Sequence, residues 1–302
     1  MSNLIIPDFG NDKQQLFDWF KLNKGLYLRQ KKTEIKHSNG FFVNLPKEFI
    51  ITPDVNKEVG ITSVDTKKMN GKVVINATNI IDSHNDLHIP KLWNRSLKMQ
   101  ANNGLHLKEH KMCFDNVLAD GAQEVKPYVT NMSWSSLGFN VDGKSQCLMH
   151  DFVLKRYDNP QLNELTKAEM YLRYLNGEVK YHSVGMIYVD IAFCVDSEEK
   201  YWAEEKDNFD KYITEAINPE IAKEEGWLCA VLEAKYVEGS AVVRPSNVAT
   251  PTVSFSEDKA APDVVTADNH IVEPSQDTQK VKLTHYDMMK TILSTQKIKN
   301  NA

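Results

Sequence analysis

The sequence predicts an α+β fold that is mainly β. Runs rich in β-branched and aromatic residues lie at 128–132, 146–154 and 184–195, and such residues favour the pleated, half-buried surface of a sheet. Apolar residues recur at helical spacing only in a few stretches outside them. We therefore expect a sheet-rich domain with a few flanking helices.

The N-terminal part is expected to contain one helix. Residues 1–65 are predicted to form an extension in which 13–35 are helical, because leucine and aromatic side chains recur there between lysines and glutamines. The helix is expected to break near Gly25. A strand is expected at 72–81, where β-branched residues follow the turn dipeptide Asn70-Gly71.

Polar and apolar segments then alternate along the chain. Residues 82–90 are predicted to form a polar loop that ends at a proline, and residues 92–100 a short helix. Strand character returns at 227–236 and 239–243.

A longer helix is predicted at 162–175. Thr166 and Glu169, three residues apart, form a capping box, and Asn176-Gly177 supplies a stop signal. The helix leads into the polar start of the strand at 184–195.

Charge is distributed unevenly along the chain. The formal net charge of −5 disfavours a broadly basic nucleic-acid binder. Residues 196–225 hold eleven acidic and four basic residues, whereas the rest of the chain holds 30 acidic and 32 basic ones. This segment is therefore predicted to be a solvated, helical, acidic insertion. No apolar run approaches the ~20 residues that cross a bilayer, so neither nucleic acid nor a membrane is an expected partner.

The C-terminal region changes in composition. Beyond Pro251 the chain is rich in Ser, Asp and Pro and has few large apolar residues. Residues 254–280 are predicted to be a disordered linker, and residues 281–302 a short helical segment.

The four cysteines, Cys113, Cys147, Cys194 and Cys229, are far apart and form no C-x-x-C pair. Three of them have apolar or aromatic neighbours. We expect small buried hydrophobes in a reducing compartment rather than disulfides or metal ligands.

One short motif points to a metal. His106, Glu109 and His110 match the H-x-x-E-H pattern of inverted zinc peptidases, in which two helical histidines bind zinc and the glutamate activates water. The alternation of Leu105 and Leu107 with polar residues predicts a strand, which would hold the two histidines too far apart to share one ion. A zinc metallohydrolase stays an alternative.

A second metal hypothesis uses Asp82, His84, Asp86 and His88. Their carboxylates and imidazoles suit a divalent ion. A stretch rich in Asp, Asn and Ser between a strand and a proline is more often a turn, however, and a turn is favoured here.

Ser183 and His110 are candidates for nucleophilic catalysis. A serine hydroxyl needs a base to take its proton, and a histidine with an ordinary pKa near ~6.5 suits that role. A carboxylate on the far ring nitrogen would fix the tautomer. With nine histidines in the chain and no G-x-S-x-G elbow, composition alone does not pair these two residues.

Four blocks in a fixed order connect these candidates. They are residues 80–90, with D-S-x-x-D and then Pro90; residues 105–110, ending in His110; residues 181–188, with S-x-G-M starting at Ser183; and residues 237–242, followed by Asn247 and Thr250-Pro251. Over residues 70–253 the chain resembles the prohead (procapsid maturation) serine proteases of tailed bacteriophages, the HK97-like family.

The resemblance assigns a role to three residues in a protease domain at 66–253. Ser183 would be the nucleophile, His110 the general base and Glu238 the orienting carboxylate. The acidic segment separates the third block from the fourth, and the family's usual glycine does not follow the proline of the first block. Asp115 is therefore the alternative to Glu238, and the role of His182 stays open. The implied fold is herpesvirus-protease-like, a mostly antiparallel β-barrel flanked by helices.

The same resemblance implies a viral role. The enzyme would act in the host bacterial cytoplasm, inside the assembling prohead, without a cofactor. Its substrates would be the major capsid protein, scaffold segments and itself, and the portal and a second copy of the chain are further candidate partners. The non-enzymatic alternative is an inactive internal scaffolding protein that docks on shell subunits through residues 281–302.

Autoprocessing in the predicted linker gives the first testable expectation. Flexible segments are preferred sites of proteolysis, so the active enzyme is expected to cut itself within residues 254–280 and release the terminal segment. Intact-mass spectrometry of the purified protein checks this. An undamaged C-terminus in an active preparation would contradict it.

Overall fold

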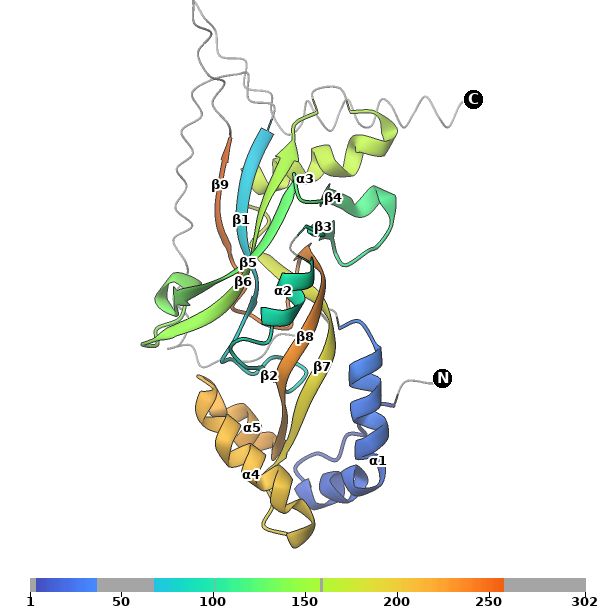
Figure 1. Ribbon diagram of the computed structural model, residues 1–302, viewed down its shortest axis with the longest axis vertical. Helices are drawn as coiled ribbons and strands as arrows, with labels where there is room; N and C mark the ends of the chain where they lie inside the picture. Colours follow the sequence, from blue (N-terminus) through green and yellow to red (C-terminus); the bar gives the residue numbers. More distant parts are fainter. Residues whose placement is uncertain (1–3, 37–67, 101, 158–159, 258–302) are drawn as a thin grey trace, which may run out of the picture. The chain divides into compact units, whose positions relative to one another are not determined.

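The computed structural model describes residues 4–36, 68–100, 102–157 and 160–257 (Figure 1). They belong to one compact unit that spans Met1–Ala260. The predicted terminal helix and the predicted linker beyond residue 257 lie outside the described residues.

The strands form two sheets. In chain order they are β1 Lys68–Ala77, β2 Asp86–His88, β3 Leu105–Lys108, β4 Val117–Asp120, β5 Val125–Ser133, β6 Lys144–Lys155, β7 Tyr181–Val195, β8 Trp227–Val242 and β9 Thr252–Glu257. The first sheet is antiparallel, in the order β5-β6-β1-β9. The predicted strand runs at 128–132, 146–154 and 184–195 lie within β5, β6 and β7, and the two runs after residue 227 are one strand, β8.

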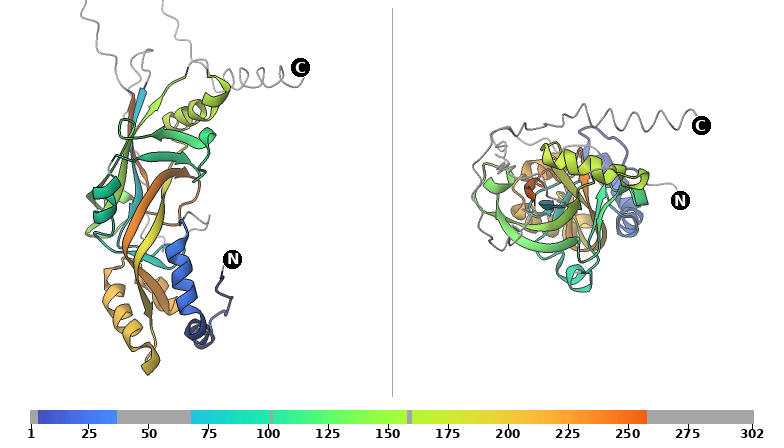
Figure 2. Two further views of the ribbon diagram at one scale, coloured as in Figure 1. Left: turned by 45° about the vertical axis from the view of Figure 1, so that its right-hand side comes forward. Right: turned by 90° about the horizontal axis from the view of Figure 1, so that it is seen from above.

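β8 organises the second sheet. Along one edge it pairs with β7, antiparallel over the whole length of both strands. Along the other edge it pairs in parallel, with β2 beside Cys229–Val231 and with β3 beside Gly239–Ala241, and β3 pairs with β4. β7 and β8 therefore form a long two-stranded ribbon, which Figures 1 and 2 show passing between the helices.

The predicted α+β class is confirmed, and most strand pairs are antiparallel. The pairing does not close, because β5 and β9 end the first sheet in the described part of the chain. The predicted barrel is therefore not confirmed. The two sheets instead share one apolar core, in which Val73 and Ile75 of β1 pack with Val184 of β7 and Tyr236 of β8.

Helices cover the sheets. They are α1 Lys13–Thr33, α2 Asn94–Gln100, α3 Leu165–Leu175, α4 Ala203–Tyr212 and α5 Pro219–Glu225, with short 3-10 turns η2 Phe114–Asn116, η3 Ser135–Leu137, η4 Leu162–Glu164, η5 Lys200–Trp202 and η6 Ile213–Glu215. α2 and the predicted helix at 162–175 are confirmed. In Figure 1, α1 lies on one side of the lower half of the β7–β8 ribbon and α4 and α5 on the other.

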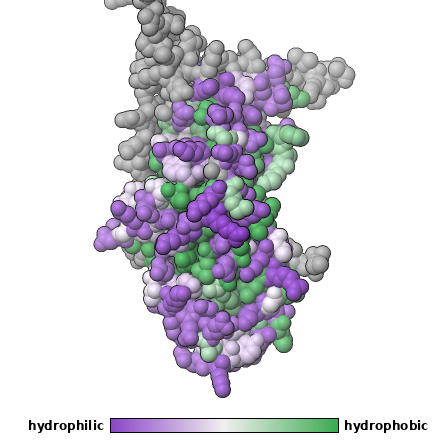
Figure 3. Space-filling view, viewed as in Figure 1, coloured by the Kyte–Doolittle hydropathy of each residue, from purple (hydrophilic) through white to green (hydrophobic). Residues whose placement is uncertain are grey.

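The acidic segment 196–225 is helical, as predicted, and is partly built into the core. Its outer surface is largely hydrophilic in the space-filling view (Figure 3). Its inner side buries Trp202, Phe209 and Tyr212 against the ribbon. The segment is thus solvated on its outer side and packed against the ribbon on its inner side.

α1 is held by an aromatic cluster. Asp12 caps the helix by accepting the Gln15 N–H at 3.0 Å. Phe20 is fully buried, with its ring centroid 4.9 Å from that of Phe193 on β7 and 5.1 Å from that of Trp227 on β8. The predicted break near Gly25 is wrong, because this packing on the ribbon carries the helix on to Thr33.

Four further local predictions are corrected by long-range packing. Asn70-Gly71 lies inside β1 and is no turn, since the Phe152 ring occupies the place of a Gly71 Cβ, 2.3 Å from Cζ. The capping box is formed by Gln161 and Glu164 at the start of η4. The loop at 82–90 contains the strand β2, because it adds to the edge of β8. Residues 254–257 belong to β9 rather than to a linker.

The cysteine prediction holds for three of the four residues. Cys147, Cys194 and Cys229 are buried, whereas Cys113 is exposed at the start of η2, and all four are free thiols.

The Phe20 cluster predicts that α1 is needed for stability. Phe20→Ala is expected to lower the free energy of unfolding by about 3–5 kcal/mol, because it removes a fully buried ring. Leu22 of the same helix is 86% exposed, so Leu22→Ala should change the free energy of unfolding by less than about 0.5 kcal/mol. Urea unfolding measures both, and equal effects would contradict the packing of α1.

Candidate active site

A tight turn after β3 directs His110 towards β8. Glu109 and His110 both adopt the left-handed region, with φ of 53° and 57°, a conformation that costs non-glycine residues on the order of 1–3 kcal/mol. Two hydrogen bonds hold the turn. The Glu109 N–H donates to the Ala241 carbonyl at 2.9 Å, and the His110 N–H donates to the Ser240 hydroxyl at 3.0 Å.

Glu238 on β8 contacts the imidazole. His110 Nδ1 lies 2.6 Å from Glu238 Oε1, and Glu238 Oε2 accepts a hydrogen bond of 2.6 Å from the Ser240 hydroxyl. The carboxylate is fully buried, so its charge depends on these partners. A proton on His110 Nδ1 satisfies Glu238 and makes Nε2 the basic nitrogen.

Gly185 makes room for this carboxylate. The register of the ribbon sets Gly185 opposite Glu238. A Cβ at Gly185 would lie 2.1 Å from Glu238 Oε1, far inside contact distance. Close approach therefore requires glycine here, in the middle of a strand.

Ser183 lies on the same face of the ribbon. It pairs with Ser240, and residues directly opposite each other on antiparallel strands project to one face. The Ser240 hydroxyl already donates to Glu238 and accepts from the His110 N–H. Ser183, which is 8% exposed, is thus the serine of this pair that can serve as a nucleophile.

The geometry distinguishes between the two candidate carboxylates. Asp115 is exposed in η2, whereas Glu238 is in contact with His110 Nδ1. The structure therefore brings His110 and Glu238 together on the face that carries Ser183, and it leaves Asp115 at the surface.

The zinc motif is not assembled as a site. His106 is buried in the core, whereas Glu109 is exposed and lies 3.7 Å from Lys111. Among the described residues, His106, Glu109 and His110 do not converge at metal-binding distance. The strand predicted for this motif, β3, ends before His110 and separates the two histidines.

The opposite face of the ribbon carries a chain of buried polar groups. Its contacts join Tyr236 Oη to His150 Nε2 at 2.9 Å, His150 Nδ1 to His106 Nδ1 at 3.3 Å, His106 Nε2 to Tyr174 Oη at 2.8 Å and Tyr174 Oη to His182 Nε2 at 2.9 Å. Burial lowers the pKa of all three histidines, that of His106 to about 3. His182, whose role the sequence left open, is a neutral core residue.

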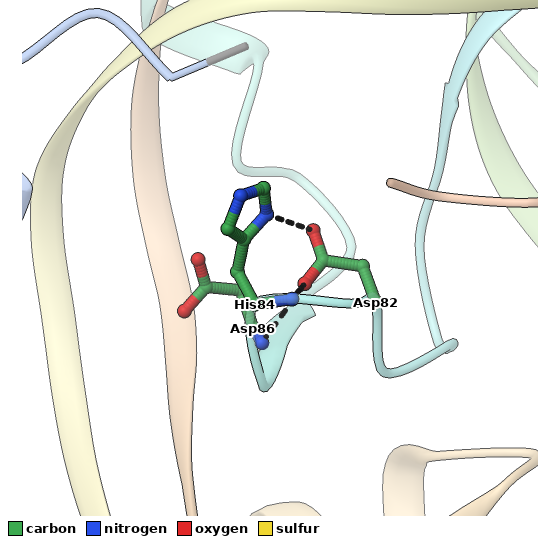
Figure 4. A group of neighbouring side chains, drawn as sticks. All are labelled: Asp82, His84 and Asp86. Atoms are coloured by element: carbon green, nitrogen blue, oxygen red, sulfur yellow. Dashed lines mark hydrogen bonds and ion pairs between the residues drawn. The ribbon is translucent and has the colours of Figure 1, made fainter. Parts of the chain in front are cut away.

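The loop before β2 is held together by contacts of the Asp82 carboxylate (Figure 4). Asp82 Oδ1 accepts the N–H groups of His84 at 2.8 Å and of Asp86 at 3.1 Å, and Asp82 Oδ2 lies 3.8 Å from His84 Nδ1. In Figure 4 the two carboxylates lie on either side of the His84 side chain. One potential ligand atom from each of Asp82, His84 and Asp86 lies within 4.8 Å of the others, so the group is compact enough to hold a metal ion.

Lys31 of α1 supplies a positive charge to this loop. Its buried ammonium pairs with Asp86, which also accepts a hydrogen bond of 2.7 Å from Tyr188 Oη on β7. Burial alone would lower the pKa of Lys31, but the Asp86 carboxylate holds it well above its usual value. The turn favoured by the sequence is thus a charge-compensated connection between α1 and the second sheet.

Two residues of this region, Lys31 and Ser240, could not be identified as important from the sequence. Lys31 is one of several lysines on an amphipathic helix, and only its burial distinguishes it. Ser240 stands in the block that begins at residue 237, and its strand pairing with Ser183 becomes visible only in the register.

Comparison of the chain with protein-family models, with curated proteins and with solved structures finds no significant match. In the described residues, no helix is long and apolar enough to cross a membrane. The function is therefore inferred from the residues and their geometry.

The buried histidines predict a loss of stability in acid. Their pKa values are lowered in the folded state, so unfolding takes up protons. Stability is full above the unfolded pKa near ~6.5 and falls as the pH drops below it, by up to about 1.4 kcal/mol per pH unit for each histidine that stays neutral in the folded state.

Urea unfolding between pH 8 and pH 4.5 measures this slope. His182→Phe should reduce it by up to about 1.4 kcal/mol per pH unit, because one titrating group is removed. A slope that is unchanged in His182→Phe would contradict the assignment.

Proposed function

We propose that the chain is a serine endopeptidase of capsid assembly, which cleaves scaffold and capsid-precursor segments inside a phage prohead. The observation that carries the proposal is the contact of His110 with the buried Glu238, on the face of the ribbon that carries Ser183. The order of the four sequence blocks supports it, since they supply these three residues. The finer expectation of a herpesvirus-protease-like barrel belongs to the same proposal.

The chemistry follows from the roles that the geometry allows. Ser183 Oγ attacks the scissile carbonyl while His110 Nε2 takes its proton, and Glu238 holds the proton on Nδ1. The resulting imidazolium is stabilised by a carboxylate that is shielded from water. The proton then passes to the leaving amine, and water hydrolyses the acyl-enzyme by the same route.

Co-expression with the major capsid protein of the same phage tests the activity. Ser183→Ala and His110→Ala are each expected to abolish cleavage of the capsid precursor on a gel, a loss of at least about 10³-fold. Glu238→Gln should lower the rate strongly, because the amide can present its N–H₂ to Nδ1 and favour the wrong tautomer.

Ser136→Ala is the matched control, since Ser136 is exposed in η3, outside the site. It should cleave like the wild type. Full activity in Ser183→Ala would contradict the mechanism. Normal shell assembly without any cleavage in the wild type would favour the inactive scaffolding protein.

A further inference from the structure

The residue after the candidate nucleophile has a backbone N–H that points away from β8. We call the edge of β7 that faces away from β8 the outer edge. His182 uses it to donate its N–H to the Thr250 carbonyl at 3.0 Å. Backbone groups of alternate residues point to the same edge of a strand, and the pairing of β7 with β8 is regular from Tyr181 to Gly185. The Val184 N–H therefore points to the outer edge as well.

This N–H has no acceptor among the described residues. Two residues further on, Met186 forms an antiparallel bridge with Lys36 on the same edge, through hydrogen bonds of 2.7 and 3.3 Å. In the described part of the chain, no such bond is formed at Val184. A backbone donor next to Ser183 is thus available to a substrate.

A small cavity lies at this part of the outer edge. Its volume is about 20 Å³, and its lining includes Ser183, Val184, Met186, Lys36 and His84. One water molecule needs roughly 10–15 Å³ of such volume. The cavity therefore has room for a single oxygen atom beside the nucleophile.

Other polar side chains of the cavity wall are engaged with each other or with the backbone. Asn76 Nδ2 lies 2.7 Å from His88 Nδ1, and Asn247 Nδ2 donates to a backbone carbonyl of β1 at 2.7 Å. Burial lowers the pKa of His88, which favours its neutral form. The positive charges on the wall therefore come from Lys36 and His84.

Two carboxylates favour the charged form of His84. Burial alone would lower the pKa of this imidazole, but Asp82 and Asp86 raise it above its usual value. His84 Nδ1 faces Asp82 Oδ2 at 3.8 Å (Figure 4). The N–H on Nε2 is therefore the one that can donate to a ligand.

Lys36 contributes a cation with little counter-charge. Its ion pair with Glu34 is long, at 4.0 Å. Burial and the neighbouring Lys31 ammonium lower the pKa of Lys36, so an anion placed beside it would stabilise the charged form. The backbone bridge to Met186 holds this residue in place independently of its side chain.

We propose that the Val184 N–H, His84 and Lys36 form the oxyanion hole of the peptidase, where they bind the oxygen of the scissile carbonyl as it gains negative charge. The inference rests on the proposed peptidase function. Donors and cations that are fixed in advance in a water-excluded site stabilise a developing charge far better than water does.

The oxyanion forms once in each half of the reaction. When Ser183 Oγ bonds to the carbonyl carbon, its proton passes to His110 and the π-electron pair of the C=O bond moves to the oxygen. The pair returns as the C–N bond breaks and the amine takes the proton from His110. Attack of water on the acyl-enzyme repeats these steps with Ser183 as the leaving group. Binding of the oxygen therefore lowers the barrier in both halves.

Kinetics of the full-length chain on the purified capsid precursor test the proposal. Lys36→Met removes the charge and keeps the backbone bridge, and His84→Gln removes the imidazolium and keeps a polar side chain. Each is expected to lower kcat at least about 10-fold with KM nearly unchanged, since one oxyanion-hole donor is worth about 10²–10³ in kcat. Lys32→Met, at an exposed lysine in the last turn of α1, is the matched control and should act like the wild type.

Ser183→Ala and a fluorophosphonate probe separate the two levels of inference. If the wild type cleaves and Ser183→Ala does not, but Lys36→Met and His84→Gln both keep the wild-type kcat, the oxyanion hole is overturned and the peptidase function stands. A change in KM alone would also overturn it, because the two side chains would then act in substrate binding. If the wild type neither cleaves nor reacts with the probe, both inferences fall.

Lys36→Arg covers the case in which Lys36→Met is slow only because it is less well folded. It restores a cation at the same position and should recover part of the lost kcat, with urea unfolding as the measure of stability. A Lys36→Arg enzyme that is as stable as the wild type but as slow as Lys36→Met would overturn the role of the charge.

Discussion

The buried carboxylate of Glu238 is the constraint on which the candidate site depends. A charge removed from water is stable only when it is paired and hydrogen-bonded. Three features meet that requirement: the absence of a Cβ at Gly185, the hydroxyl of Ser240 and the imidazole of His110. Because Gly185 and Ser240 sit in the β7–β8 ribbon, its register also determines where Ser183 lies.

A second buried charge pair connects the N-terminal helix to the same ribbon. Lys31 and Asp86 are both buried, and Tyr188 Oη of β7 bonds to the carboxylate. Removing one partner of such a pair typically costs about 3–5 kcal/mol. α1 thus packs firmly on the ribbon, and its end is held close to β7.

The elements with strong local patterns could be predicted from the sequence. Strand runs and the helix at 162–175 came from short-range signals, whereas His110, Ser183 and Glu238 were singled out by the resemblance of four ordered blocks to a known family. The turn predicted at Asn70-Gly71 was wrong because turn propensity is a local property, whereas the packing of Phe152 on Gly71 is long-range. The burial of Lys31 and the pairing of Ser183 with Ser240 arise only in the folded chain, so no local pattern could reveal them.

Strand alternation keeps two kinds of polar chemistry apart. Ser183 and His182 are neighbours on β7 but project to opposite faces, one towards the charged His110–Glu238 pair and the other into the neutral histidine–tyrosine chain. At Gly239, next to Glu238, a Cβ would lie 2.4 Å from His150 Cε1, so close packing of His150 requires glycine at this position of β8. Burial lowers the pKa of His150, so the histidine–tyrosine chain stays uncharged on its own face of the ribbon, apart from the His110–Glu238 pair.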